Sequence, residues 1–155
     1  MDIMEPTDLY ITGSFALNMR PPDHNTGDWH PWGKGEEDLI FYCGKFGRFN
    51  TNEVFNDYGI YDASYWLNYH GIEAKTNFAA NHQRAVLDLV YFYLLIMSRP
   101  DLKPMYFAIE DYFDDVIDTN IILELAENML PYTNEDQKQK LLDWIHNERY
   151  NHKNF

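Results

Sequence analysis

The sequence has a single cysteine, few basic residues and no long apolar run, and each shortage excludes a class of protein. Cys43 has no second cysteine with which to form an intramolecular disulfide, so we expect a cytoplasmic protein. Lys and Arg total 12 against 25 Asp and Glu, a formal charge of −13, whereas a protein that binds duplex nucleic acid directly needs a basic surface. The same charge disfavours binding to anionic membranes.

The chain also lacks the signals of export and of membrane insertion. Residues 1–6 have neither the basic nor the apolar region of a secretory signal, so we expect none. The most apolar run, residues 85–97, is interrupted by Asp88 and is too short to span a bilayer. It predicts a core helix in a protein without a membrane segment.

Apolar and aromatic side chains, in contrast, are plentiful. They make up 45% and 17% of the 155 residues, which argues against intrinsic disorder because large side chains offset the entropy cost of ordering. The length suits one domain, so we expect residues 1–155 to fold as a single domain.

The sequence pattern changes near residue 78 and predicts an α+β fold. Short apolar runs between turn residues predict a β-rich part over about residues 8–61, and longer segments with helical spacing predict a helical part over about 79–150. We expect a small mixed or antiparallel sheet from the N-terminal half, packed by helices from the C-terminal half. The expected strands are residues 9–12, 38–43 and 53–61, the last with Asp57 and Gly59 near a bend. The expected helices are residues 15–19, 62–69, 82–98, 104–113, 119–130 and a last one after Thr133 or Asn134.

The predicted helices carry their own packing and capping signals. Asp62 and Asn81 are expected N-caps, and Pro131 is expected to end the helix before it. A helix over residues 82–98 would carry apolar side chains around almost its whole circumference, which indicates that it is buried in the centre of the fold. The expected packing face of the last helix consists of Leu141, Leu142, Ile145 and Tyr150.

The most informative segment is residues 9–18, where a short apolar run leads into Gly13-Ser14 and a helix-forming stretch. A helix that begins directly after a strand presents backbone N–H groups to a phosphate, and Ser14 can add its hydroxyl. Asp28 and His30 lie two residues apart, so they project to one side if the chain there is extended. A carboxylate beside an imidazole could hold a divalent metal near that phosphate.

This segment resembles the opening motif of nucleotidyltransferase-fold proteins, in particular the antitoxins of bacterial abortive-infection systems. That family has a hydrophobic strand, a Gly-Gly or Gly-Ser pair, a short helix with Ala-Leu, and Asp-x-Asp on the next strand. Here Gly13-Ser14 matches the pair, Ala16-Leu17 lies in the helix, and Asp28 matches the first metal-binding Asp.

The match departs from the family pattern at His30, which stands where the second Asp belongs. Neutral imidazole is a poor ligand for hard magnesium ions, so a two-metal site would be incomplete. Asp57 is the candidate for the family's third carboxylate, which lies on a later strand. The resemblance therefore implies a degenerate nucleotidyltransferase-like core, with a divalent metal as the one cofactor to consider.

Residues 9–18, 27–30 and 80–85 also resemble segments of small proteins from anaerobic gut bacteria. This second likeness covers more of the chain than the first. It implies a bacterial source and no particular activity.

The same residues also have a purely structural interpretation. Gly13-Ser14 could be an ordinary strand-to-helix turn, and Asp28 could accept backbone hydrogen bonds within a loop. Trp29, Trp32 and two histidines cluster in this part of the sequence, however, and such a cluster suits a stacked base or another flat ligand.

His82 and Arg84 are polar residues at the start of the most apolar predicted helix. They could face the glycine–serine turn and bind an anion there. Arg84 could instead pair with Asp28 or Asp57 and lock the helix to the sheet, because an unpaired buried guanidinium is costly. Asp88, one helical turn away, is a further partner for it. The two roles are compatible.

Residues 101–143 hold 11 acidic and 3 basic side chains, a balance of −8. Such a stretch is usually a solvated helix face, but it can also dock a basic partner such as a toxin or a nucleic-acid-binding protein. The residues expected to form this partner face are Glu110, Asp111, Asp114, Asp115 and Asp118.

Two functions of different classes follow. The first is an interaction protein that neutralises or regulates a basic partner, within a toxin–antitoxin or phage-defence pair. The alternative is an enzyme that binds a nucleotide or phosphate with Ser14, Asp28, His30 and Arg84. A homodimer formed through exposed Tyr and Phe is a third alternative. The sequence has no Walker-type glycine loop, dinucleotide fingerprint or Ser-His-Asp motif.

Overall fold

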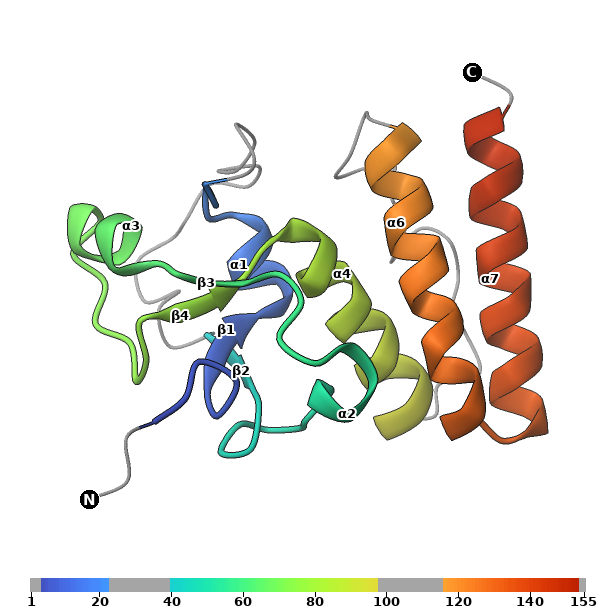
Figure 1. Cartoon of the computed structure of the whole chain (residues 1–155), viewed down its shortest axis with the longest axis horizontal. Coiled ribbons are helices and arrows are strands. Elements are labelled where there is room, and N and C mark those ends of the chain that lie inside the picture. The colour runs from blue at the N-terminus through green and yellow to red at the C-terminus, as the bar shows by residue number, and fades with distance from the viewer. Residues whose placement is uncertain (1–3, 23–39, 98–115, 154–155) are drawn as a thin grey trace. The chain divides into compact units, whose positions relative to one another are not determined.

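The computed structural model describes residues 4–22, 40–97 and 116–153 (Figure 1). The chain divides into two compact units, residues 1–85 and 86–155, and the division falls inside helix α4 (His82–Tyr91). The prediction that the whole chain is one domain stays a prediction.

The first unit is built on a sheet. In the described residues this sheet has four strands in the order β2-β1-β4-β3. The central strand β1 (Tyr10–Thr12) runs antiparallel to β2 (Phe41–Cys43) and parallel to β4 (Phe78–Ala80), and β4 runs antiparallel to β3 (Ile60–Asp62). The sheet is therefore mixed and comes from the N-terminal half, which confirms the predicted α+β class.

Helices follow both central strands directly. α1 (Gly13–Leu17) begins at the residue after β1, and α4 begins two residues after β4. Because β1 and β4 are parallel, with Ile11 opposite Ala79, both helices begin at the same edge of the sheet. Two shorter helices flank β3 along the chain, α2 (Asn52–Phe55) before it and α3 (Ser64–Tyr69) after it. The fully buried centre of this unit includes Tyr10, Ile11, Ala16, Met19, Ala79 and Ala80.

The second unit is helical in its described residues. The last turns of α4 continue as a π-helical segment η2 (Phe92–Ile96), and α6 (Val116–Ala126) continues as a 3₁₀ segment η4 (Glu127–Tyr132). The last helix, α7 (Glu135–Lys153), packs along α6 (Figure 1). No helix among the described residues is long and apolar enough to cross a bilayer. The buried side chains of α6, η4 and α7 include Ile122, Leu123, Met129, Leu141, Trp144 and Ile145.

Two predicted helix caps are confirmed. The side-chain oxygen of Asn81 accepts a hydrogen bond from the backbone N–H of Arg84 at 2.9 Å, at the start of α4. Asn134 and Gln137 form reciprocal bonds of 2.8 and 2.9 Å between side chain and backbone at the start of α7. This reciprocal pattern is a capping box, which satisfies two backbone donors at once.

The prediction of one strand over residues 53–61, with Asp57 and Gly59 near a bend, is correct in the bend and wrong in the continuous strand. The segment begins as α2, turns at Asn56 and Gly59 with φ angles of 53° and 76°, and only then enters β3. Positive φ values are incompatible with a continuous strand. β4 was not predicted either, because two of its three residues are alanines, which have little intrinsic strand preference.

Other helix predictions need correction. Pro131 lies inside η4 and does not end α6, which stops at Ala126. Leu142 and Tyr150 are exposed, since the buried stripe of α7 follows positions 141, 144, 145 and 148 at helical spacing. The helix predicted over residues 104–113 lies outside the described residues.

Candidate functional site

The Gly13-Ser14 turn lies at the sheet edge where α1 and α4 begin. Gly13 has a φ of 68°, in the left-handed region that favours glycine, and this allows the abrupt change from strand to helix. The Ser14 residue is exposed, and its carbonyl accepts a hydrogen bond from Nδ2 of Asn18 at 3.0 Å. The turn thus offers one hydroxyl-bearing side chain to solvent.

His82 is fully buried in the first turn of α4. Its Nε2 lies 2.7 Å from the carbonyl oxygen of Met19, and because a carbonyl can only accept, Nε2 carries the proton. This bond ties α4 to the chain that leaves α1. Since Met19 directly precedes Arg20, His82 also fixes the backbone from which the Arg20 side chain extends.

Arg84 is also fully buried, and its guanidinium is directed into the protein. It lies 5.4 Å from the ring centre of Tyr10 and 5.3 Å from that of Phe55. Arg84 therefore holds the segment from α2 to β3 against α4. Its hydrogen bonds run from Nη1 to the carbonyl oxygens of Phe55 (3.4 Å), Asn56 (3.0 Å) and Tyr58 (2.8 Å), and from Nη2 to Thr51 Oγ1 (3.0 Å) and Asn52 Oδ1 (3.1 Å).

Several predicted site residues lie outside the described part of the chain. Asp118 lies half-buried on α6, and Asp57 lies in the exposed turn before β3 rather than on a strand. In the described residues, no group of three or more His, Cys, Asp or Glu side chains could hold a metal ion. The predicted residues outside the description are Asp28, His30, Glu110, Asp111, Asp114 and Asp115.

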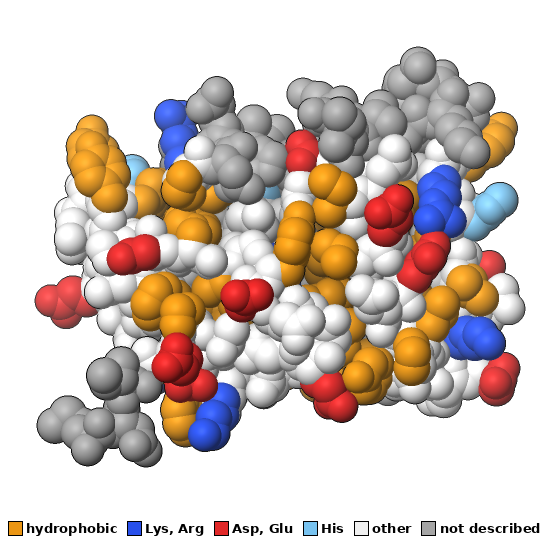
Figure 2. All heavy atoms as spheres, in the orientation of Figure 1, with side chains coloured by type: hydrophobic (Ala, Val, Ile, Leu, Met, Phe, Trp, Pro, Cys, Tyr) orange, Lys and Arg blue, Asp and Glu red, His pale blue; other side chains and the backbone are white. Residues whose placement is uncertain are grey.

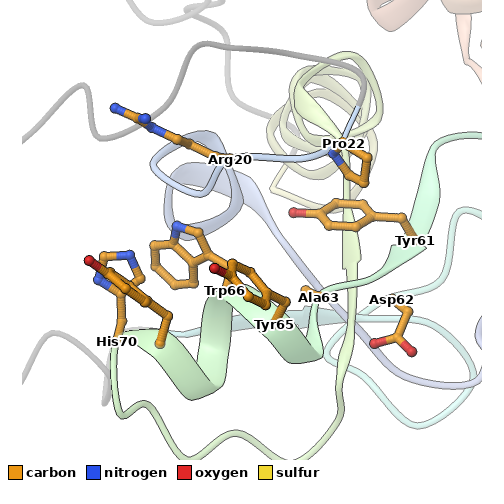
Figure 3. Close-up of a pocket in the computed structure, with 9 residues that line it drawn as sticks. Arg20, Pro22, Tyr61, Asp62, Ala63, Tyr65, Trp66 and His70 are labelled. Atoms are coloured by element: carbon orange, nitrogen blue, oxygen red, sulfur yellow. The ribbon is translucent and has the colours of Figure 1, made fainter.

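A cavity of about 610 Å³ lies beside α3 in the first unit (Figure 3). This volume is within the range of roughly 300–1,000 Å³ that is typical of small-molecule sites. Three segments of the chain form its walls, the stretch after α1, the end of β3, and α3 itself. The lining residues are Arg20, Pro22, Tyr61, Asp62, Ala63, Tyr65, Trp66, Tyr69 and His70.

Aromatic rings dominate this cavity. Trp66 is only 7% exposed, and its ring centre lies 4.2 Å from that of His70. Tyr65 and Tyr69, which are 84% and 76% exposed, stack on each other with centroids 6.4 Å apart and planes 18° apart. Phe15 of α1 meets Trp66 edge-on at 6.4 Å. Hydrophobic side chains consequently gather over α3 on the surface, with cationic and histidine side chains beside them (Figure 2).

The polar groups of the cavity are unevenly placed. Arg20 is exposed and extends over the side of Trp66 that carries the indole nitrogen, and the hydroxyl of Tyr61 points toward the same space (Figure 3). The carboxylate of Asp62 lies apart from these groups (Figure 3). Its Oδ1 accepts hydrogen bonds from the hydroxyl and the backbone N–H of Ser64, and these bonds lower the pKa of Asp62 below its ordinary value of 3.8.

Sequence reasoning did not single out this cavity, although one signal for it exists. Residues 64–70 read Ser-Tyr-Trp-Leu-Asn-Tyr-His, with rings paired at i and i+4 as Tyr65/Tyr69 and Trp66/His70. The two ring pairs begin at adjacent positions, which are about 100° apart around a helix, so together they cover a wide face of it. A short helix that packs one side against a sheet is therefore expected to leave part of this aromatic surface exposed.

Comparison with protein-family models, with curated proteins and with solved structures finds no significant match to this chain. The nucleotidyltransferase-like reading of Gly13-Ser14 therefore depends on the motif in the sequence.

Proposed function

We propose that this protein is a degenerate nucleotidyltransferase-like protein that acts by binding a partner, with little or no catalysis of its own. It works in the cytoplasm, as the neutralising member of a toxin–antitoxin or phage-defence pair. The antitoxin-like segment at residues 9–18 supports this role. His30, which replaces the second metal-binding Asp of the motif, supports the loss of turnover.

The burial of Arg84 is the observation that carries the proposal. A cation that serves phosphoryl transfer has to face the charge that develops on the substrate. Arg84 was the sequence's candidate for that task, but its guanidinium is buried and donates to backbone carbonyls of the α2–β3 segment. His82 likewise donates the proton of its Nε2 to the carbonyl oxygen of Met19. Both residues serve as structural supports, which favours a binding protein over an enzyme.

The charge distribution supports a basic partner. Residues 101–143 account for −8 of the total charge of −13. Opposite charges steer encounter between proteins and raise the association rate at low salt. A complex of this kind weakens as salt concentration rises.

A turnover assay and a partner assay test the proposal together. The full chain is incubated with each nucleoside triphosphate and Mg²⁺, and we expect no product above the protein-free background. The partner captured by the tagged chain is then identified, purified and titrated against it by calorimetry at low and high salt. We expect a complex that weakens at high salt.

Two variants with equal charge change give the matched control. The first neutralises Glu110, Asp111, Asp114 and Asp115 to their amides. The second neutralises four exposed carboxylates of the first unit, and both variants remove four negative charges. We expect the first variant to weaken the complex about tenfold or more and the second to weaken it much less. Equal effects would contradict the proposed face, and nucleotide turnover that disappears in Ser14→Ala would favour the enzyme instead. The four control positions are Glu5, Glu53, Asp57 and Glu73.

A further inference from the structure

We propose that the cavity beside α3 binds a small planar heteroaromatic ligand that carries a phosphate, of which a purine mononucleotide is the simplest example. This site is distinct from the Gly13-Ser14 turn, which does not line the cavity. The inference therefore stands independently of the partner-binding function proposed above.

The rings of the cavity provide the stacking surface. Tyr65 and Tyr69 leave most of their surface in water, which is an unusual arrangement for two neighbouring aromatic side chains on a six-residue helix. Trp66, by contrast, is nearly buried and contacts the rings of Phe15 and His70. A base that enters the cavity meets rings on fixed backbone and buries apolar surface that is now exposed. Stacking of this kind accepts any base, because every base has a π-face.

Arg20 provides the phosphate contact. Its planar guanidinium can donate two parallel hydrogen bonds to phosphate oxygens, a geometry that lysine cannot reproduce. The bond from His82 to the carbonyl of Met19 anchors the backbone next to Arg20, so the side chain extends from a fixed point. The nearest acidic lining residue, Asp62, has its carboxylate engaged by Ser64 at the start of α3. The cavity thus joins a cation to an aromatic floor.

The net charge of the chain limits the length of the anion. A nucleic-acid strand brings one negative charge with every nucleotide, and a protein of charge −13 repels each of them. A mononucleotide brings a single phosphate of about −2 charge, to which one arginine can donate two hydrogen bonds. The structure therefore favours a small ligand over a strand.

Calorimetric titration of the full chain tests the site with three probes: AMP, adenosine and ribose 5-phosphate. We expect AMP to bind most tightly, adenosine about tenfold more weakly because it lacks the phosphate, and ribose 5-phosphate most weakly because it lacks the base. Equal affinity for AMP and adenosine would overturn the role of Arg20. The absence of AMP binding at millimolar concentration would overturn the site as a whole.

Substitutions at exposed positions locate the binding. We expect Arg20→Gln to weaken AMP about tenfold while leaving adenosine unchanged, and Tyr65→Ala to weaken both ligands. Arg48→Gln removes an exposed arginine of the same unit that does not line this cavity, and it is expected to change neither. Ser14→Ala is also expected to change neither. Loss of AMP binding in Ser14→Ala, with full binding in Tyr65→Ala, would move the ligand to the glycine–serine turn and overturn the inference.

Discussion

Arg84 donates a hydrogen bond of 3.0 Å from Nη1 to the carbonyl oxygen of Asn56, a residue held at a φ of 53° and a ψ of −134°. Few residues other than glycine adopt this backbone conformation. The carbonyls of Phe55, one residue before Asn56, and of Tyr58, two residues after it, also accept from Nη1. The hydrogen bonds from the guanidinium therefore stabilise the turn and offset the free-energy cost of the strained backbone at Asn56.

Replacing this arginine should therefore destabilise the first unit severely. In Arg84→Met the side-chain volume is largely kept, but the turned carbonyls lose their buried donor, and we expect a loss on the order of 3–5 kcal/mol in the free energy of unfolding. Arg84→Lys keeps the charge but lacks the planar guanidinium fork of N–H donors, so we expect a smaller loss in the free energy of unfolding. Urea denaturation followed by circular dichroism measures both. Equal losses in the two variants would contradict the role of the fork.

The close approach of Gly59 to α4 yields a second prediction. Gly59 has a φ of 76°, and a Cβ there would lie 2.4 Å from the side-chain oxygen of Asn81 and 2.8 Å from Cβ of Arg84. Gly71 has a similar φ of 64° but meets nothing within 4 Å. Gly71→Ala should cost about 1 kcal/mol from backbone strain alone, whereas Gly59→Ala should cost roughly 1–3 kcal/mol more from the clash.

The difference between these two alanine variants is the informative quantity, because both share the same backbone strain. It is obtained from the urea midpoints of the two variants measured side by side. A difference near zero would mean that the α2–β3 turn can move away from α4 without cost.

The helix ends marked by asparagine could be predicted from the sequence, whereas only the bend near Asp57 and Gly59, and not its contacts with Arg84, could be predicted for the turn. Asn81 and Asn134 cap their helices through bonds to residues three positions later, which is a purely local signal. The turn at Asn56 and Gly59, by contrast, depends on contacts with α4 more than twenty residues away in the sequence. Asn, Asp and Gly favour a bend there locally, but the contacts with Asn81 and Arg84 arise only in the folded chain.

The candidate site also has a part that could be predicted from the sequence and a part that could not. The strand, glycine and helix around Gly13-Ser14 are adjacent in the sequence, so their arrangement could be predicted. The cavity joins Arg20, Tyr61 and α3, and only the folded sheet brings these segments together. The inward direction of the Arg84 side chain was one of two alternatives that the sequence left open, because three of its acceptors are backbone carbonyls, which every residue carries.

Asp62 gives a prediction for the pH dependence of stability. The hydrogen bonds from Ser64 lower the pKa of this carboxyl below 3.8, so the folded state holds the proton less readily than the unfolded chain. Its contribution is fully present above the ordinary pKa and is lost as the pH falls below 3.8 through the lower folded value. We expect Asp62→Asn to cost ~0.5 kcal/mol at neutral pH, since the side chain is exposed, and nothing at the acid end.

Two measurements check this prediction. Urea denaturation of the wild type and of Asp62→Asn over the acidic range gives the difference in stability at each pH. Glu53→Gln, which removes another exposed negative charge from the first unit, serves as the control for net charge. A carbon-13 titration of the Asp62 carboxyl gives its pKa directly, and a value at or above 3.8 would contradict the argument.

The capping box at α7 can be tested in the full chain by substitutions at positions of α7 and its cap. Asn134→Ala removes the acceptor for the backbone N–H of Gln137, and also the rigid local geometry in which Gln137 bonds back to residue 134. We expect a loss of about 1 kcal/mol, as is typical of N-cap asparagine. Asn147→Ala is the matched control, because Asn147 is exposed in the interior of the same helix, where alanine is the better helix former. The control should therefore be neutral or slightly stabilising, and a destabilisation as large as that of Asn134→Ala would show that the cap has no special role.

Since the bond from Gln137 Nε2 to the carbonyl of Leu94 at 3.2 Å also joins α7 to η2, Gln137→Ala should cost more than Asn134→Ala.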